Sequence, residues 1–170
     1  FWDELFIFPF INLRMPVITR QLLLYRYRRL PEARRAAKSA GLKGAMFPWQ
    51  SGSSGREESQ RLHLNPMSGR WLADSSYLQR HVNAAIIYNV WQYLQVTEDQ
   101  EFLVFYGAEL MLEIIRFWGC IARYDSSRQR FNIEGVMGPD EFHTRGPGSS
   151  QAAGVKNNAY TNIMVAWGIA

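Results

Sequence analysis

The chain has 170 residues, a formal net charge of +4, and apolar and charged fractions of 47% and 20%. These values are close to the average of globular domains and exclude a disordered chain, a fibrous repeat and a disulfide-rich scaffold. The single cysteine, Cys120, excludes an internal disulfide and a cysteine-rich metal site, and no apolar run approaches the roughly 20 residues of a membrane-spanning helix.

The first forty residues predict an aromatic entry and two helices. Residues 1–10 are aromatic and apolar, which favours a buried entry to the domain. Over residues 13–30 apolar side chains recur near helical spacing, with Pro16 near the first turn, where proline is tolerated. Pro31 begins a second stretch of strong helix formers, and Gly41 is placed to end it.

Glycines and prolines recur through residues 41–75 and interrupt any long helix or strand. Trp49, Trp71 and several charged side chains lie among them, which is too aromatic and too charged a composition for a flexible linker. A long loop of this kind within a compact domain is typically functional. We therefore expect the segment to contribute to a site.

Two long helices are expected next, as an antiparallel pair. Helical spacing predicts the first over residues 76–96. Thr97-Glu98-Asp99-Gln100 resembles a capping box and opens the second, which runs through Ile121 after a short join. Residues 128–136 alternate and predict a short strand, and a last helix starts near Asn158. The sum is an all-α fold of paired helices with long loops and a short β segment.

Arginines gather between residues 20 and 35, where Glu32 is the only acid. A basic cluster can be the footprint of a phosphate backbone. Here no exposed aromatic residues interleave with the arginines, and no nucleic-acid motif adjoins them. We interpret the cluster as a solvated helix face and expect neither a nucleic acid nor a membrane as a partner.

The sequence indicates neither a phosphate loop nor a metal site. The glycine-rich run Ser51-Gly52-Ser53-Ser54-Gly55 lacks the lysine of a phosphate loop. His63, His81 and His143 are far apart in the sequence and form no i, i+4 pair, which argues against zinc.

Two pairs of neighbouring acids, Glu57-Glu58 and Asp140-Glu141, lie in predicted loops beside aromatic residues and glycine. A carboxyl group near apolar walls can have its pKa raised enough to act as a general acid. Glycoside cleavage needs such a proton donor at the leaving oxygen, and tryptophans that stack on sugar faces fit the same chemistry. Each acid taken alone is more commonly a cap or an ion-pair partner, so both interpretations stay open.

Five motifs in a fixed order carry a resemblance to a known family. They are Phe1-Trp2-Asp3-Glu4, Phe47-Pro48-Trp49-Gln50-Ser51-Gly52, His81-Val82-Asn83-Ala84, Gly138-Pro139-Asp140-Glu141-Phe142-His143 and Asn157-Asn158-Ala159-Tyr160-Thr161-Asn162. Over essentially all 170 residues the sequence resembles glycoside hydrolase family 65, the maltose, trehalose and kojibiose phosphorylases.

The resemblance implies that residues 1–170 are a fragment of a single (α/α)6-barrel catalytic domain, cut at both ends, from a cytoplasmic enzyme. Glu141 would be the general acid that protonates the glycosidic oxygen while inorganic phosphate attacks the anomeric carbon from the opposite face. The products would be β-glucose 1-phosphate and a released sugar. The partners implied are a disaccharide and phosphate as co-substrate, with no metal and no organic cofactor.

The resemblance also implies a set of substrate-binding residues. Trp2 and Asp3 would bind the glucose unit, with Trp2 packed on the ring and Asp3 accepting hydrogen bonds from hydroxyls. Trp49, Glu58 and His81 fall in family motifs and are expected in the pocket wall.

The remaining polar residues of the motifs are interpreted as structural. Asp140 is expected to fix its loop as a hydrogen-bond acceptor, and His143 is more readily structural than a contact to phosphate or sugar. Asn157 and Asn158 are expected to cap the last helix.

The residues leave the subtype open, because the segment that binds phosphate in the family has no counterpart here. We favour a phosphorylase, since phosphorylases prevail in the family. The alternatives are an α-glucoside hydrolase of the same family and an inactive carbohydrate-binding or structural fragment. The choice of disaccharide and a homodimeric parent are also left open.

Overall fold

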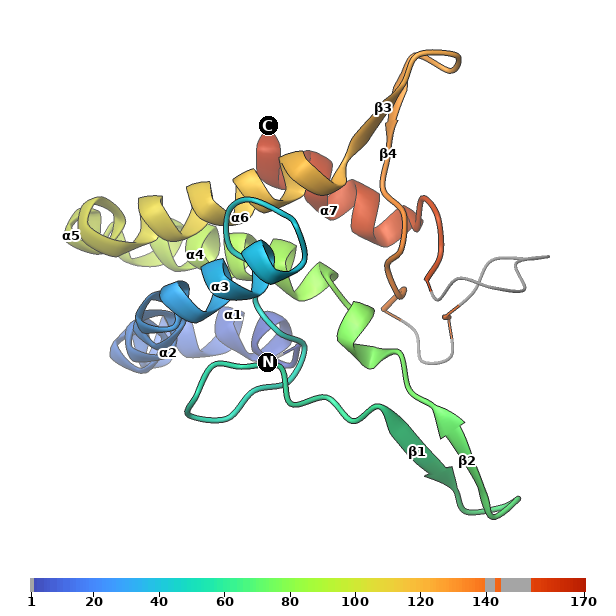
Figure 1. The fold of residues 1–170 in the computed structure, drawn as a ribbon. Coiled ribbons are helices and arrows are strands. Elements are labelled where there is room, and N and C mark those ends of the chain that lie inside the picture. The colour runs from blue at the N-terminus through green and yellow to red at the C-terminus, as the bar shows by residue number, and fades with distance from the viewer. Residues whose placement is uncertain (1, 140–142, 145–153) are drawn as a thin grey trace.

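Helix α4 (His81–Thr97) is the central element of the structure, a computed structural model that describes residues 2–139, 143–144 and 154–170 (Figure 1). Ten of its 17 residues are buried, as expected of a helix that is apolar almost all round. The helices that pack against it are α1 (Glu4–Arg14), α2 (Pro16–Arg28), α6 (Ala108–Ile121) and α7 (Ala159–Ile169).

Proline separates α1 from α2. Pro16 has no N–H to donate and disfavours helical backbone at the residue before it, so Met15 leaves the helical region at φ −145° and ψ 60°. The helix expected over residues 13–30 therefore begins at Pro16. Helix α3 (Leu30–Ser39) follows, and Gly41, at φ +74°, lies just beyond its end, as expected.

The expectation of a buried entry at residues 1–10 is wrong for most of α1. Phe8 is completely buried, whereas Phe6 and Phe10 are 67% and 58% exposed. Apolar residues are spread around this helix, but it packs on α4 and α2 through one face only. Its other face is therefore uncovered in the part of the chain that the structure describes.

The antiparallel helix pair is confirmed, but its capping residue differs from the prediction. Asp99 caps the second helix, and its Oδ1 accepts the N–H of Phe102 at 2.9 Å. The Thr97 hydroxyl instead donates to the carbonyl of Tyr93 at 2.8 Å, within α4. The second helix has three consecutive parts, which are α5 (Gln100–Phe102), the π-helical turn η2 (Leu103–Gly107) and α6.

Two antiparallel hairpins project from the helical body (Figure 1). The first pairs β1 (Leu62–Asn65) with β2 (Arg70–Ala73) inside the segment expected to be a loop. The second pairs β3 (Arg123–Asp125) with β4 (Arg130–Asn132), which is shorter than the strand predicted over residues 128–136. Strands of three or four residues are too short to show a clear alternation, which is why the sequence reveals them poorly.

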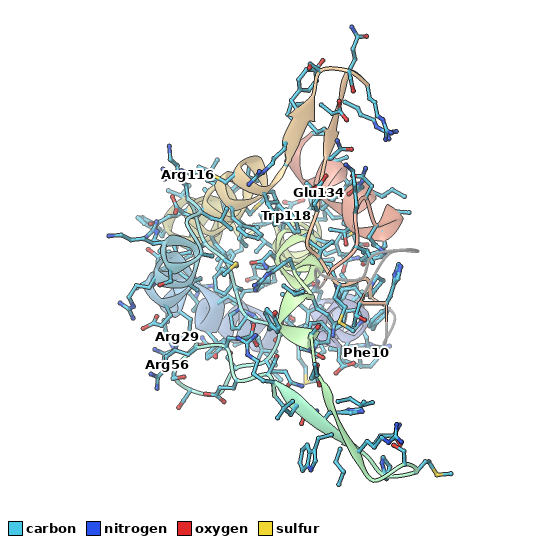
Figure 2. The ribbon with its side chains drawn as sticks, turned by 45° about the vertical axis from the view of Figure 1, so that its right-hand side comes forward. Phe10, Arg29, Arg56, Arg116, Trp118 and Glu134 are labelled. Atoms are coloured by element: carbon cyan, nitrogen blue, oxygen red, sulfur yellow. The ribbon has the colours of Figure 1, made fainter. Side chains whose placement is uncertain are left out.

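The core lies between α4, α6 and the first three helices, where Trp118 is completely buried (Figure 2). The architecture is mostly helical with two small hairpins. In the described part of the chain, no helix has both the length and the apolar character needed to cross a membrane.

Two contacts fasten the loop after α3 to the helical body. At Gly44, which has φ +79°, a Cβ would clash with the backbone carbonyl of Glu113, so the close approach to α6 requires glycine. Asn83, completely buried in α4, accepts the N–H of Phe47 at 2.7 Å and donates to its carbonyl at 3.2 Å. These bonds hold the chain that leads to Trp49 beside the start of α4.

Candidate active site

A hollow of about 460 Å³, which we call the aromatic hollow, lies between segments that are far apart in the sequence. Its volume is within the range of ligand pockets, about 300–1,000 Å³. Trp2 lies in its wall just before α1, Trp49 comes from the long loop, and Pro139 follows the β3–β4 hairpin. The other lining residues are Gln50, Ser59, Gln60, His63, Leu72, Ala73, Asp74, Ser75, Ser76, Gln79, Met137 and Thr144.

Four rings from four segments form a cluster at this hollow. The His81 ring centroid lies 4.5 Å from that of Trp2, 5.4 Å from Trp49 and 6.0 Å from Tyr160. Trp2 also meets Tyr160 edge-on at 5.7 Å. Edge-to-face contacts at these separations are favourable beyond the area that they bury. The cluster therefore brings together motifs from the first residues, the long loop, the start of α4 and α7.

His81 lies behind the wall of the hollow and does not line it. Its side chain is completely buried, and this burial lowers its pKa from 6.5 to about 4, with the nearby backbone of Met137 opposing the shift. The imidazole is therefore neutral near pH 7. Its contacts suit the positioning of Trp2 and Trp49.

The buried imidazole makes stability depend on acidity. Because the pKa of His81 is lower in the folded chain, the unfolded chain binds the proton first, and stability falls as the pH drops from about 6.5 to 4. We expect this side chain to account for a loss of about 3 kcal/mol in the free energy of unfolding. Urea unfolding of the full-length parent across this range should show a shallower pH dependence for His81→Phe. A slope for His81→Phe equal to that of the parent would contradict the assignment.

Glu57 organises the loop beneath Trp49. One of its carboxylate oxygens accepts the N–H of Trp49 at 3.0 Å. The other accepts the N–H of Gln50 at 3.3 Å and the hydroxyl of Ser59 at 2.6 Å. Glu57 thus caps loop N–H groups, which favours the cap among the interpretations of this acid.

Two predicted substrate-binding acids lie outside the lining of the hollow. Asp3 is exposed at the start of α1, and its side chain makes no capping hydrogen bond there. Glu58 is exposed and accepts the hydroxyl of Ser54 at 3.2 Å. Of the five residues predicted to bind substrate, the structure thus places Trp2 and Trp49 in the wall and His81 directly behind them.

Glu141, the predicted general acid, and its neighbour Asp140 lie outside the described residues. The chain on either side is described, and both Pro139 and Thr144 line the aromatic hollow. His143 is exposed, with its Nδ1 3.5 Å from the amide nitrogen of Asn158.

Only one of the two asparagines expected to cap the last helix does so. Asn158 is the N-cap of α7 and accepts the N–H of Thr161 at 3.0 Å. Asn157 instead accepts the N–H of Ile133 at 3.0 Å and donates to the side chain of Asn132 at 2.7 Å. Its side chain thus joins the end of the β3–β4 hairpin to the residue before α7, and its backbone is left-handed at φ 54°.

Sequence reasoning missed two residues of the site. Tyr160 stands in a motif that carries the family resemblance, so its position was a usable signal. Asp74 is the only carboxylate among the described residues of the wall, and no sequence pattern marked it. Burial opposes its charge, but hydrogen bonds from Ser76 and Gln60 outweigh that and lower the pKa of Asp74. It is therefore ionised and can accept hydrogen bonds from a ligand.

The described residues contain no group of three or more histidine, cysteine, aspartate or glutamate side chains placed to hold a metal ion.

Comparison with known proteins identifies the relatives of this chain. The model of the Glycosyl hydrolase family 65 central catalytic domain matches residues 1–170. Over 167 residues the chain is 48% identical to trehalose 6-phosphate phosphorylase of Lactococcus lactis subsp. lactis, covering 98% of this chain and 21% of the relative. Over 173 residues it is 39% identical to kojibiose phosphorylase of Halothermothrix orenii, with the same two coverages. An uncharacterized glycosyl hydrolase of Mycobacterium tuberculosis is 59% identical over 167 residues, covering 98% of this chain and 12% of the relative.

A solved structure agrees with these sequence matches. The structure, described as "Putative kojibiose phosphorylase from human microbiome", superposes with a TM-score of 0.76 at 26% identity. The match covers 99% of this chain and 20% of that one. The chain thus spans between 12% and 21% of the length of these relatives.

Proposed function

Because the chain belongs to glycosyl hydrolase family 65, we propose that residues 1–170 are part of the (α/α)6 catalytic domain of a disaccharide phosphorylase. The mostly helical architecture and the phosphorylase relatives at 39% and 48% identity support this proposal. The observation that carries it is the aromatic hollow. Two tryptophans meet there with Pro139 of the Gly-Pro-Asp-Glu motif and with Met137 and Thr144, which lie on either side of that motif in the sequence.

Glu141 is proposed as the general acid. It gives its proton to the glycosidic oxygen as the bond from that oxygen to the anomeric carbon breaks, and an oxygen of inorganic phosphate attacks the same carbon from the opposite face. Configuration inverts, so an α-glucoside yields β-glucose 1-phosphate and a released sugar. The presence of Pro139 and Thr144 in the wall of the hollow supports this role, because Glu141 lies between them in the sequence.

The sugar contacts follow from the chemistry of the wall. Trp2 and Trp49 offer apolar ring surfaces to the faces of a glucose unit, and His81 holds both rings in place. Asp3, the residue next to Trp2, is proposed to bind glucose hydroxyls. Glu58 is proposed as a substrate-binding residue from the long loop that contributes Trp49. Asp74 adds an ionised acceptor inside the hollow.

The proposed substrates are α-glucosyl disaccharides of the kinds that the relatives' names give, which are trehalose 6-phosphate, kojibiose and trehalose. Maltose belongs to the same chemical class.

The full-length parent tests this proposal. We expect it to convert at least one of these four disaccharides to β-glucose 1-phosphate only when inorganic phosphate is present, as followed by NMR of the anomeric proton. Release of free glucose without phosphate would instead identify a hydrolase. Binding of the sugars without turnover would identify a carbohydrate-binding protein.

A further inference from the structure

A second cavity, which we call the arginine pocket, has a volume of about 700 Å³ and lies against the same loop as the aromatic hollow. Arg35, Arg56, Arg61 and Arg80 all line it. Arg56 lies near Arg29, away from Phe10 (Figure 2). The two cavities share no lining residue.

Neighbouring residues of the chain separate the two cavities. Gln60 lines the aromatic hollow, and Arg61 lines the arginine pocket. The same alternation holds for Gln79 and Arg80 at the start of α4. The same stretches of chain therefore border a hollow lined by one carboxylate, Asp74, among its described residues and a pocket lined by four arginines.

The carboxylates of the arginine pocket leave most of its positive charge unpaired. Glu32 forms an ion pair with Arg35 at 2.8 Å. Both carboxylate oxygens of Glu57 accept hydrogen bonds from the loop groups described above. Within the described residues, no carboxylate lies at ion-pair distance from Arg56, Arg61 or Arg80. Four arginines and two carboxylates thus line the pocket. Neither carboxylate forms an ion pair with Arg56, Arg61 or Arg80.

Two of the unpaired arginines are held in place. The guanidinium carbon of Arg61 lies 3.7 Å from the centre of the Tyr77 ring. A guanidinium stacked on a ring in this way keeps the N–H groups at its edge available for hydrogen bonds to a ligand. Arg80 is half-buried, and burial lowers its pKa, opposed by the charge of Glu57. A charge that has lost solvent in this way gains most from an anion beside it.

We propose that the arginine pocket binds a phosphoryl group, carried by inorganic phosphate or by the phosphate monoester of a small molecule. A planar guanidinium fork matches the oxygens of a phosphate and bonds to two at once. A phosphoryl dianion would match the excess of two positive charges that the lining carries. This inference goes beyond the proposed function, because the pocket stands apart from the aromatic hollow.

Calorimetric titration of the full-length parent with glucose 6-phosphate, inorganic phosphate and glucose tests the proposal. We expect glucose 6-phosphate or phosphate to bind with a component of the heat that disappears when Arg61 and Arg80 are replaced. The heat from glucose, and from phosphate at the catalytic site, should be unaffected by those replacements. The double variant Arg61→Gln/Arg80→Gln should weaken phosphate-dependent binding at least about tenfold, since two charge-assisted contacts are lost. The matched control is Arg28→Gln, an exposed arginine of α2 outside both cavities, which should bind as the parent does.

Two further variants keep the outcome decisive. Arg56→Gln changes an exposed loop residue and should weaken binding even if the double variant does not fold. Trp2→Ala changes a residue that lines the aromatic hollow and not the arginine pocket, and it should leave this binding intact. The proposal is overturned if neither phosphate compound binds or if the arginine variants bind as tightly as the parent. It is equally overturned if Trp2→Ala alone abolishes binding, because the ligand would then occupy the hollow. A lower melting temperature of the double variant without a change in affinity would likewise overturn the proposal, because these arginines would then serve stability and not ligand binding.

Discussion

Replacing Glu141 with glutamine should lower kcat of the full-length parent about a thousandfold on its disaccharide substrate. Glutamine keeps the shape of the side chain but has no proton to give, so the leaving sugar would have to depart as an alkoxide. KM should change far less, because the substitution removes an interaction made in the transition state. The measurement is the initial rate of β-glucose 1-phosphate formation at saturating phosphate.

The leaving group separates loss of the acid from general damage to the site. On α-glucosyl fluoride, where fluoride departs without protonation, Glu141→Gln should keep most of the parent's rate with phosphate. The matched control is Glu134→Gln, a nearby exposed glutamate paired with Lys156 at 2.6 Å, which should stay close to the parent on both substrates. A Glu141→Gln variant with near-normal kcat on the disaccharide would remove this residue from the mechanism.

Replacing Asn83 with alanine should destabilise the full-length parent by about 3 kcal/mol. The substitution leaves the N–H and the carbonyl of Phe47 without their buried partner and opens a small cavity. Since these bonds hold the chain that leads to Trp49, KM for the disaccharide should rise as well. Chemical unfolding and steady-state kinetics measure the two effects.

A second asparagine of α4 provides the control. Asn89 is also buried, and its side-chain oxygen has no hydrogen-bond partner among the described residues. Asn89→Ala should therefore cost at least about 1 kcal/mol less than Asn83→Ala, because a cavity opens without the loss of such a bond. Equal costs for the two variants would show that the contacts to Phe47 contribute nothing beyond packing.

Sequence reasoning predicted the helical elements well where local signals decide them. Gly41 follows α3 and Asn158 caps α7, as expected, and Pro16 lies in the first turn of α2, although that helix begins at residue 16 and not at residue 13. Each of these effects acts within a few residues, through a missing N–H, a left-handed turn or a side-chain cap. The ordered motifs likewise identified the family that the comparison with known proteins shows.

Local signals failed where two nearby residues could play the same part. Thr97 and Asp99 both suit an N-cap, and the choice of Asp99 goes with its bonds to Arg20 and Tyr93 from other helices. Asn157 and Asn158 both suit the cap of α7, and a bond to the chain after the β3–β4 hairpin takes Asn157 away. In each case a partner distant in the sequence decides the outcome, and no window of sequence contains it.

The sequence by itself predicted the end of α3, the cap of α7, the family and the residues worth testing as a site. The tertiary structure alone decided which of those residues meet: Trp2 and Trp49 share a wall, and His81 stands neutral behind them. The tertiary structure also decided which arginines line the arginine pocket, since these come from two helical segments and the long loop. The physical reason is that burial, ring contacts and unpaired charge depend on distances between segments, which the order of residues along a chain does not contain.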